Sequence, residues 1–216
     1  MYRKKKLLLL TQFSILLAIE AIVCFTPLGS LPAVGPVVAT LSHLPVIITA
    51  ILLGPRAGAG MGFFFGLFSF IVWTFMPPAP IAFVFTPFYT LGEIHGNLWS
   101  IAICFIPRIL IGVVSGFAYQ WLLKKTKSKV IIYGISAVLG SLTNTFLVLA
   151  GIFFIFGHSY AAAIGSSYQF LKTVFAMTIL TNGIPEAIIG SILSYGICGP
   201  MVHINRRYSI SDSDGR

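Results

Sequence analysis

Charged residues are scarce in this chain of 216 residues: they make up 9% of the sequence, with 14 Lys and Arg against 5 Asp and Glu. Soluble globular domains carry about 25% charged residues. Hydrophobic residues reach 57%, so too few charges remain to cover a surface that faces water. The composition excludes an ordinary soluble domain and predicts a multi-pass protein of the cell membrane.

Several motifs that carry chemistry are also missing. The sequence has no GxxxxGK[ST] loop for ATP, no HExxH zinc motif and no GxSxG nucleophile motif. Cys24, Cys104 and Cys198 each stand alone in an apolar stretch, which is typical of small buried hydrophobic residues. No enzyme activity, metal or cofactor is therefore predicted. If the chain moves a solute uphill, a partner must supply the energy.

Six apolar runs approach the length of about 20 residues that crosses a bilayer. The first run continues into Phe25-Thr26-Pro27 without a small-residue cleavage site, so we expect a retained span rather than a cleaved signal. The second run is short, and we expect it to span only with help from its neighbours. The runs cover residues 7–26, 37–54, 57–76, 100–123, 130–156 and 171–200.

The basic residues are distributed unevenly among the segments that separate these apolar runs. All Lys and Arg except Arg108 and Lys172 fall in residues 1–6, in the turn at 54–56, in 124–129 or in the tail. The positive-inside rule then places both termini in the cytoplasm. Because membrane spans separate the clusters, a nucleic-acid interface is not expected.

These patterns predict an all-α fold, a six-span transmembrane helical bundle with both termini cytoplasmic. We expect one substrate-binding domain over residues 1–205 and a disordered cytoplasmic tail over 206–216. The outer connections are long, apolar and rich in proline, so we expect them to fold back over the bundle as a lid. They cover residues 27–36, 77–99 and 157–170 and include the polar residues Glu93, His95, Asn97 and Tyr168.

Small residues recur at helical spacing in three runs. In the third and fourth runs glycines stand four residues apart, which predicts close helix packing within the chain. These glycines are Gly58, Gly62, Gly66, Gly112 and Gly116. In the first run Ser14, Ala18 and Ala21 share one side of the helix, where they either pack internally or form a docking face for another membrane subunit.

Charged and polar residues inside a membrane usually face a cavity or a partner. Arg108 is the most informative, because its planar fork of donors matches a carboxylate or a phosphate. It either points into an outward-facing cavity or reaches the outer lipid headgroups. The other residues of this kind are Glu20, Glu93, Asn144, Lys172 and Glu186.

The remaining polar candidates also leave two interpretations open. Asn144 offers donors and an acceptor to a ligand or to a neighbouring helix. Asn182 and Glu186 stand four residues apart on one helical face, where Glu186 either accepts from a substrate or pairs with Arg108 or Lys172. Lys172 is otherwise a helix-end anchor. Glu20 is expected to be hydrogen-bonded within the bundle, and Trp73, Trp99 and Trp121 to anchor the membrane interface.

Three segments then give a resemblance. SHLPVIITAILLGPRAGAGMGFFFGL (42–67), FVFTPF (83–88) and GNLWSIAICFIPRILIGVVSG (96–116) are similar to the pantothenate type of substrate-binding S component of energy-coupling factor vitamin transporters. The resemblance extends over nearly the whole chain. Related S components take pyrimidine precursors, riboflavin or folate, so the substrate is less specific than the family.

The resemblance implies a vitamin-binding subunit whose outer pocket is capped by the loops after spans one, three and five. It implies docking on a membrane scaffold subunit through small residues of the first span, here Ser14, Ala18 and Ala21, and an energy supply from two ATPase subunits. The expected pocket residues are Arg108, Asn144, Asn97, Glu186, Asn182, Tyr168 and Lys172.

Pantothenate carries a carboxylate, an amide and two hydroxyls, which suits Arg108 for the charge and Asn144 with its neighbours for the rest. An ion-coupled secondary carrier is the alternative from another class. It would need an ion-coupling carboxylate, for which Glu20 or Glu186 is available, and an internal repeat of the kind that many such carriers show, which the sequence does not show.

Overall fold

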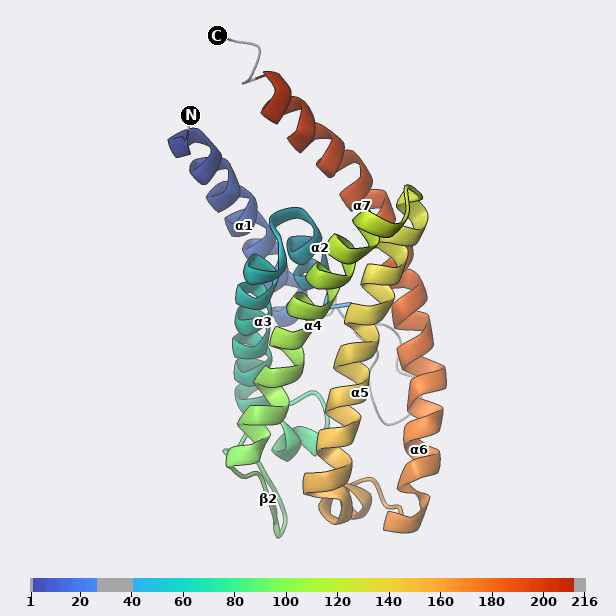
Figure 1. Cartoon of the computed structure of the whole chain (residues 1–216). Coiled ribbons are helices and arrows are strands. Elements are labelled where there is room, and N and C mark those ends of the chain that lie inside the picture. Colours follow the sequence, from blue (N-terminus) through green and yellow to red (C-terminus); the bar gives the residue numbers. More distant parts are fainter. Residues whose placement is uncertain (1, 27–40, 212–216) are drawn as a thin grey trace.

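The computed structural model describes residues 2–26 and 41–211, and the side chains of residues 7–26 and 41–202. The described chain is almost entirely helical, as predicted (Figure 1). Its one hairpin pairs β1 with β2 in antiparallel register, Thr90 opposite His95 and Leu91 opposite Ile94. In chain order the elements are α1 (Tyr2–Phe25), α2 (Leu44–Leu53), α3 (Pro55–Phe75), the 3₁₀ helix η2 (Pro80–Val84), β1 (Thr90–Leu91), β2 (Ile94–His95), α4 (Leu98–Lys125), α5 (Lys129–Ala163), the 3₁₀ helix η3 (Tyr168–Phe170), α6 (Leu171–Thr178), the π-helix η4 (Ile179–Gly183) and α7 (Ile184–Ser211).

Five helical stretches of the described chain are long and apolar enough to cross a membrane. The sixth expected span, 37–54, is represented by α2, which has only 10 residues and is therefore about 15 Å long, half of the ~30 Å hydrocarbon core. The described residues thus support five full spans and one short buried helix, and they do not confirm the count of six. The five stretches are Leu7–Phe25, Pro55–Phe75, Leu98–Lys125, Lys129–Ala163 and Tyr168–Val202.

The connections fall at two opposite ends of the bundle (Figure 1). The α2–α3 turn with Arg56 and the α4–α5 turn with Lys124 and Lys129 lie at the end where the chain starts and finishes. The β1–β2 hairpin and the α5–η3 connection lie at the other end. α7 includes residues 206–211 of the predicted tail, whereas 212–216 and the predicted outer segment 27–36 lie outside the described residues.

Helices α3 and α4 approach each other through their glycines, which confirms the predicted close packing within the chain and identifies the two partners. A Cβ atom on Gly62 would collide with the backbone carbonyl oxygen of Arg108, and one on Gly112 would collide with the carbonyl group of Gly58. Gly116 meets Pro55 in the same way. Backbones this close can be built only without side chains, so the glycines fix where α4 lies and hence the position of Arg108.

Two apolar clusters form the core. One contains Val46 of α2, Met61 of α3 and Ile111 of α4. The other lies nearer the hairpin end and contains Phe83 of η2 and Ile152 of α5. The candidate site lies where these two clusters meet.

Candidate functional site

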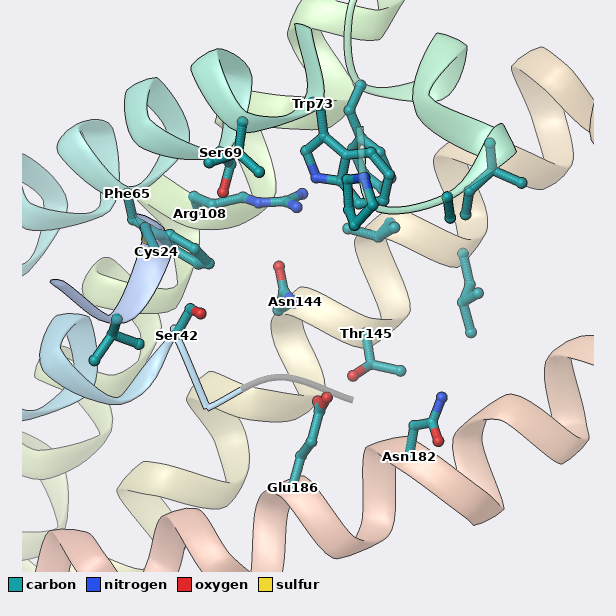
Figure 2. A pocket seen from close by; sticks show the side chains of 18 of the residues that line it. Cys24, Ser42, Phe65, Ser69, Trp73, Arg108, Asn144, Thr145, Asn182 and Glu186 are labelled. Carbon is teal, nitrogen blue, oxygen red and sulfur yellow. The ribbon is translucent and has the colours of Figure 1, made fainter. Parts of the chain in front are cut away.

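A cavity of about 570 Å³ opens between α1, α3, α4, α5 and η4–α7 (Figure 2). This volume lies within the range of about 300–1,000 Å³ that is usual for small-molecule sites. Most of its lining is apolar, with a few polar side chains from different helices. The lining residues are Val23, Cys24, Phe25, Thr26, Ser42, Phe65, Ser69, Val72, Trp73, Met76, Pro78, Ala79, Ile81, Phe85, Arg108, Asn144, Thr145, Val148, Leu149, Ile152, Thr178, Asn182, Gly183 and Glu186.

The Arg108 side chain is anchored by its own helix. Pro107 lacks an N–H group, so it cannot make the α-helical hydrogen bond to the carbonyl oxygen of Ile103. Arg108 Nη1 donates to that same oxygen at 3.1 Å. The Pro-Arg pair therefore frees a backbone acceptor and immediately uses it to orient the guanidinium.

Two aromatic rings flank the guanidinium. Its central carbon lies 5.0 Å from the ring centroid of Phe85 and 5.6 Å from that of Phe65, within cation–π distance. Phe85 in turn stacks on Trp73, with ring centroids 4.7 Å apart. Trp73 therefore lines the cavity, a location that the sequence did not indicate.

Arg108 is buried, with 6% of its surface exposed, so the alternative of a side chain that reaches the lipid headgroups is wrong. Within the described part of the chain, its Nε has no hydrogen-bond partner, and no carboxylate oxygen lies within 4.0 Å of the guanidinium. The alternative ion pair with Glu186 is therefore absent. A buried charge without an ion-pair partner is costly, and such a group is well suited to an anionic ligand.

The opposite side of the cavity is polar as well. Figure 2 shows Arg108 pointing into the cavity from one side and Asn182 and Glu186 from the other, with Asn144 of α5 between them. Asn144 Oδ1 is buried and has no hydrogen-bond partner among the described residues. The alternative of an interhelical hydrogen bond to this oxygen is thus not found among the described residues, and the oxygen can accept from a ligand.

A π-helical turn carries Asn182 toward the cavity. Ile184 N–H donates to the carbonyl oxygen of Ile179, five residues back. Pro185 follows directly, and without an N–H group it cannot bond to the Thr181 carbonyl in the α-helical manner. Such single π turns are frequent at functional sites.

We call Thr178, Asn182, Gly183 and Glu186 the glutamate wall, and Phe65, Ser69, Trp73, Phe85 and Arg108 the arginine wall.

Sequence reasoning missed the hydroxyl groups of the cavity. Ser42, Ser69, Thr145 and Thr178 all line it, but nothing in the sequence separates them from the many Ser and Thr residues that only bond to their own helix. Cys24 also lines the cavity. Its thiol donates to Glu20 Oε1 at 3.3 Å, which confirms the expected hydrogen bond for Glu20 inside the bundle.

Three of the predicted pocket residues do not line this cavity. Asn97 is the N-cap of α4, where Oδ1 accepts from the N–H of Trp99 at 2.9 Å. Tyr168 stacks on His158 with ring centroids 4.2 Å apart. Lys172 is exposed on α6. The cavity thus brings together Arg108 and Asn144 with the Asn182–Glu186 pair.

The first helix presents its small residues outward. Ser14 and Ala18 are exposed and Ala21 is half-buried, so two of the three do not pack inside the bundle.

Among the described residues no group of three His, Cys, Asp or Glu side chains could hold a metal ion.

Comparisons with known proteins identify the family of this chain. Residues 8–198 match the family model described as "ECF transporter, substrate-specific component". The chain belongs to this family. It is also 39% identical over 163 residues to the pantothenic acid transporter PanT of Lactococcus lactis subsp. cremoris (strain MG1363), an alignment that covers 75% of this chain and 76% of the relative.

Membership explains the composition and the missing motifs. A substrate-specific component of an ECF (energy-coupling factor) transporter is an integral membrane protein that provides substrate binding, and it is not an enzyme. The apolar helices of the described chain agree with this role.

Proposed function

We propose that this ECF component binds pantothenate in the cavity between the arginine and glutamate walls. One observation carries the proposal: the buried Arg108 guanidinium faces the cavity and has no carboxylate within ion-pair distance among the described residues. A planar donor fork in a low-dielectric site favours a ligand carboxylate. The similarity to a relative named as a pantothenic acid transporter supports the same substrate.

The other polar groups suit the rest of the molecule. Asn144 Oδ1 can accept from the amide N–H of pantothenate, and its location between the two walls matches the amide's location between the carboxylate and the hydroxyls. Asn182 and Glu186 then lie near the hydroxyl end. The apolar lining covers the methyl and methylene groups, as is usual in small-molecule sites.

The proposal extends to the arrangement in the membrane. Residues 1–205 would form one domain of six spans, with α2 counted as the second, and both termini would be cytoplasmic. The shared location of the Arg56, Lys124 and Lys129 turns with the two chain ends supports this orientation.

Transport requires partners in this account. A membrane scaffold subunit would dock on the α1 face formed by Ser14, Ala18 and Ala21, and two ATPase subunits would supply the energy. Exposure of Ser14 and Ala18 supports a docking face, because small residues let a second helix backbone approach closely.

Mass spectrometry of the small molecule that copurifies with the detergent-extracted protein tests the substrate. We expect pantothenate, and addition of pantothenate to the emptied protein should change the fluorescence of Trp73, which lines the cavity. Trp73→Phe is the control and should lose this change in fluorescence, because Trp99 and Trp121 are exposed and do not line the cavity. A bound pyrimidine, flavin or folate would overturn the substrate. Gradient-driven uptake into vesicles that hold this chain alone would favour a secondary carrier instead.

A further inference from the structure

The hydroxyl group of Ser69 differs in its hydrogen bonding from the other hydroxyls that line the cavity. Thr145 and Thr178 donate to the backbone carbonyl oxygens four residues earlier, at 3.4 and 2.9 Å. The Ser42 hydroxyl lies within hydrogen-bonding reach of the Cys24 thiol. Ser69 is 8% exposed and lines the cavity, yet its Oγ has no hydrogen-bond partner among the described residues.

A serine or threonine inside a membrane helix commonly bonds to the carbonyl oxygen four residues earlier. Thr74, further along α3, makes this bond to Phe70 at 2.7 Å. Ser115 of α4 makes it to Ile111 at 2.6 Å. A buried polar group that makes no such bond costs free energy. The Ser69 hydroxyl is therefore available to a ligand in the cavity.

Ser69 lies between the two aromatic contacts of the guanidinium. Phe65, Ser69 and Trp73 follow one another at four-residue spacing, so they share one face of α3. The Phe65 ring lies 5.6 Å from the guanidinium carbon of Arg108. Trp73 stacks on Phe85, whose ring centroid lies 5.0 Å from the same carbon. Figure 2 shows Ser69 and Arg108 together on one side of the cavity.

Contacts between α3 and α4 place the two groups at neighbouring levels of the bundle. Cys104 Sγ donates to the carbonyl oxygen of Gly66 at 3.5 Å, and Gly66 lies about one helical turn before Ser69. The Arg108 side chain runs back along α4 toward this level, since its Nη1 donates to the Ile103 carbonyl. A ligand group held by the guanidinium thus lies close to the Ser69 hydroxyl.

A carboxylate in this cavity needs more donors than the guanidinium supplies. Its two oxygens offer about four acceptor sites, of which a bidentate guanidinium fills two, and most of the lining is apolar. The arginine wall has two uncharged side-chain donors, the Ser69 hydroxyl and the Trp73 indole N–H. The hydroxyl hydrogen rotates to suit an acceptor, whereas the indole ring is held in its stack on Phe85.

We infer that Ser69 is a second carboxylate-binding residue, whose hydroxyl donates to the ligand carboxylate beside Arg108. The inference rests on the proposed function, because it takes pantothenate as the ligand and places its carboxylate at Arg108. Hydrogen bonds to a charged acceptor are stronger than those to a neutral one. Ser69 therefore also contributes to the preference for an anion over a neutral group.

Calorimetric titration of the purified full chain, wild type and Ser69→Ala, tests this role. The two ligands are pantothenate and its analogue with an alcohol in place of the carboxylate. Ser69→Ala should bind pantothenate about tenfold more weakly. The analogue should lose less affinity, so the preference for pantothenate falls severalfold. An unchanged affinity for pantothenate, or an equal loss for both ligands, would overturn the inference.

A control and a second variant keep the test decisive. Ser115→Ala removes a fully buried hydroxyl of α4 that does not line the cavity, and it should leave the preference unchanged. Ser69→Cys keeps a side chain of similar size with only a weak donor, and it should lower the preference as Ser69→Ala does. A wild-type preference in Ser69→Cys, or an equal shift in Ser115→Ala, would contradict the role of the Ser69 hydroxyl.

The two proposals fail in different ways. If the wild-type protein binds no pantothenate, the proposed function fails and this inference fails with it. If pantothenate binds and Arg108→Ala weakens it while the Ser69 variants do not, only the role of Ser69 is lost.

Discussion

The two walls of the cavity each place a proline directly before a charged residue, yet the local structures differ. On the arginine wall Pro107 frees the carbonyl oxygen of Ile103, and the Arg108 side chain occupies it. On the glutamate wall the chain before Pro185 adopts a π turn. A proline followed by a charged residue therefore accompanies a continuous α-helix in α4, where the Arg108 side chain bonds the freed carbonyl, and a wider π turn before α7.

Packing around the two prolines explains the difference. Helix α4 lies against α3 through Gly62 and Gly112, where a single added carbon would collide with backbone, so its path is fixed. At Gly183 an added carbon would meet side chains and no neighbouring backbone, with Thr145 at 3.3 Å and Ile179 at 3.8 Å. The arginine wall is built as a rigid support for one charge, whereas the glutamate wall has room for a wider turn.

Removing the charge on the rigid wall should have the largest effect. We expect Arg108→Ala to weaken pantothenate binding by about 1.5–3 kcal/mol, the range for a lost hydrogen bond to a charged group, which is about 10- to 150-fold in affinity. Calorimetric titration measures it, and the melting temperature reports whether the fold is intact. An unchanged affinity would remove Arg108 from the site.

Disturbing the α3–α4 contact that positions Arg108 should have the second-largest effect. Gly62→Ala should destabilise the protein by about 1–3 kcal/mol, as overpacking does, and it should weaken binding because the new carbon displaces the Arg108 backbone. Gly60→Ala is the matched control on the same helix, where the nearest atom lies 3.9 Å away, on Phe13. Thermal unfolding in detergent measures the stability of both variants. Equal melting temperatures for Gly62→Ala and Gly60→Ala would contradict the close contact of α3 with α4 at Gly62.

The hydrogen bond behind Arg108 should have a smaller effect. Pro107→Ala restores an N–H group that competes for the Ile103 carbonyl, so we expect the affinity for pantothenate to fall by about 0.5–1.5 kcal/mol. Pro200→Ala makes the same change inside α7, at a residue that does not line the cavity, and should leave binding unaltered. Equal effects of the two substitutions in a binding assay would speak against this use of the freed carbonyl.

The smallest effect is expected at a cation outside both walls. Lys172 is exposed and does not line the cavity, so Lys172→Ala should change the affinity by less than about 0.5 kcal/mol, as surface substitutions usually do. The same titration checks it. A loss comparable to that of Arg108→Ala would show that the anion is bound elsewhere.

Much of the arginine wall could be predicted from the sequence. Glycines at four-residue spacing predicted close packing of these two helices within the chain, although not which helix each one meets. Arg108 stood out because it departs from the sorting of the other basic residues. Both signals are local or compositional, so they do not depend on how distant segments meet. The aromatic partner Phe85 could not be found in this way, because its position over Arg108 depends on how the connection between α3 and α4 folds back.

The structure of the glutamate wall and of the loops was harder to predict from the sequence. A four-residue spacing joined Asn182 with Glu186, but the π turn at Ile179–Gly183 has only Gly183 and Pro185 as a sequence signal. Asn97 was expected in the pocket, although its spacing to Ser100 is that of a capping pair and the structure uses it as one. Polar residues in long connections serve local needs that composition does not distinguish from ligand binding.

The central claim is that the guanidinium of the arginine wall grips the carboxylate of the vitamin, and a double-mutant cycle tests it most directly. Pantothenate and the analogue with an alcohol in place of the carboxylate are titrated into the wild-type protein and into Arg108→Ala. The account predicts that the wild type prefers pantothenate by at least about tenfold and that this preference disappears in the variant. A preference of the same size in both proteins would contradict it.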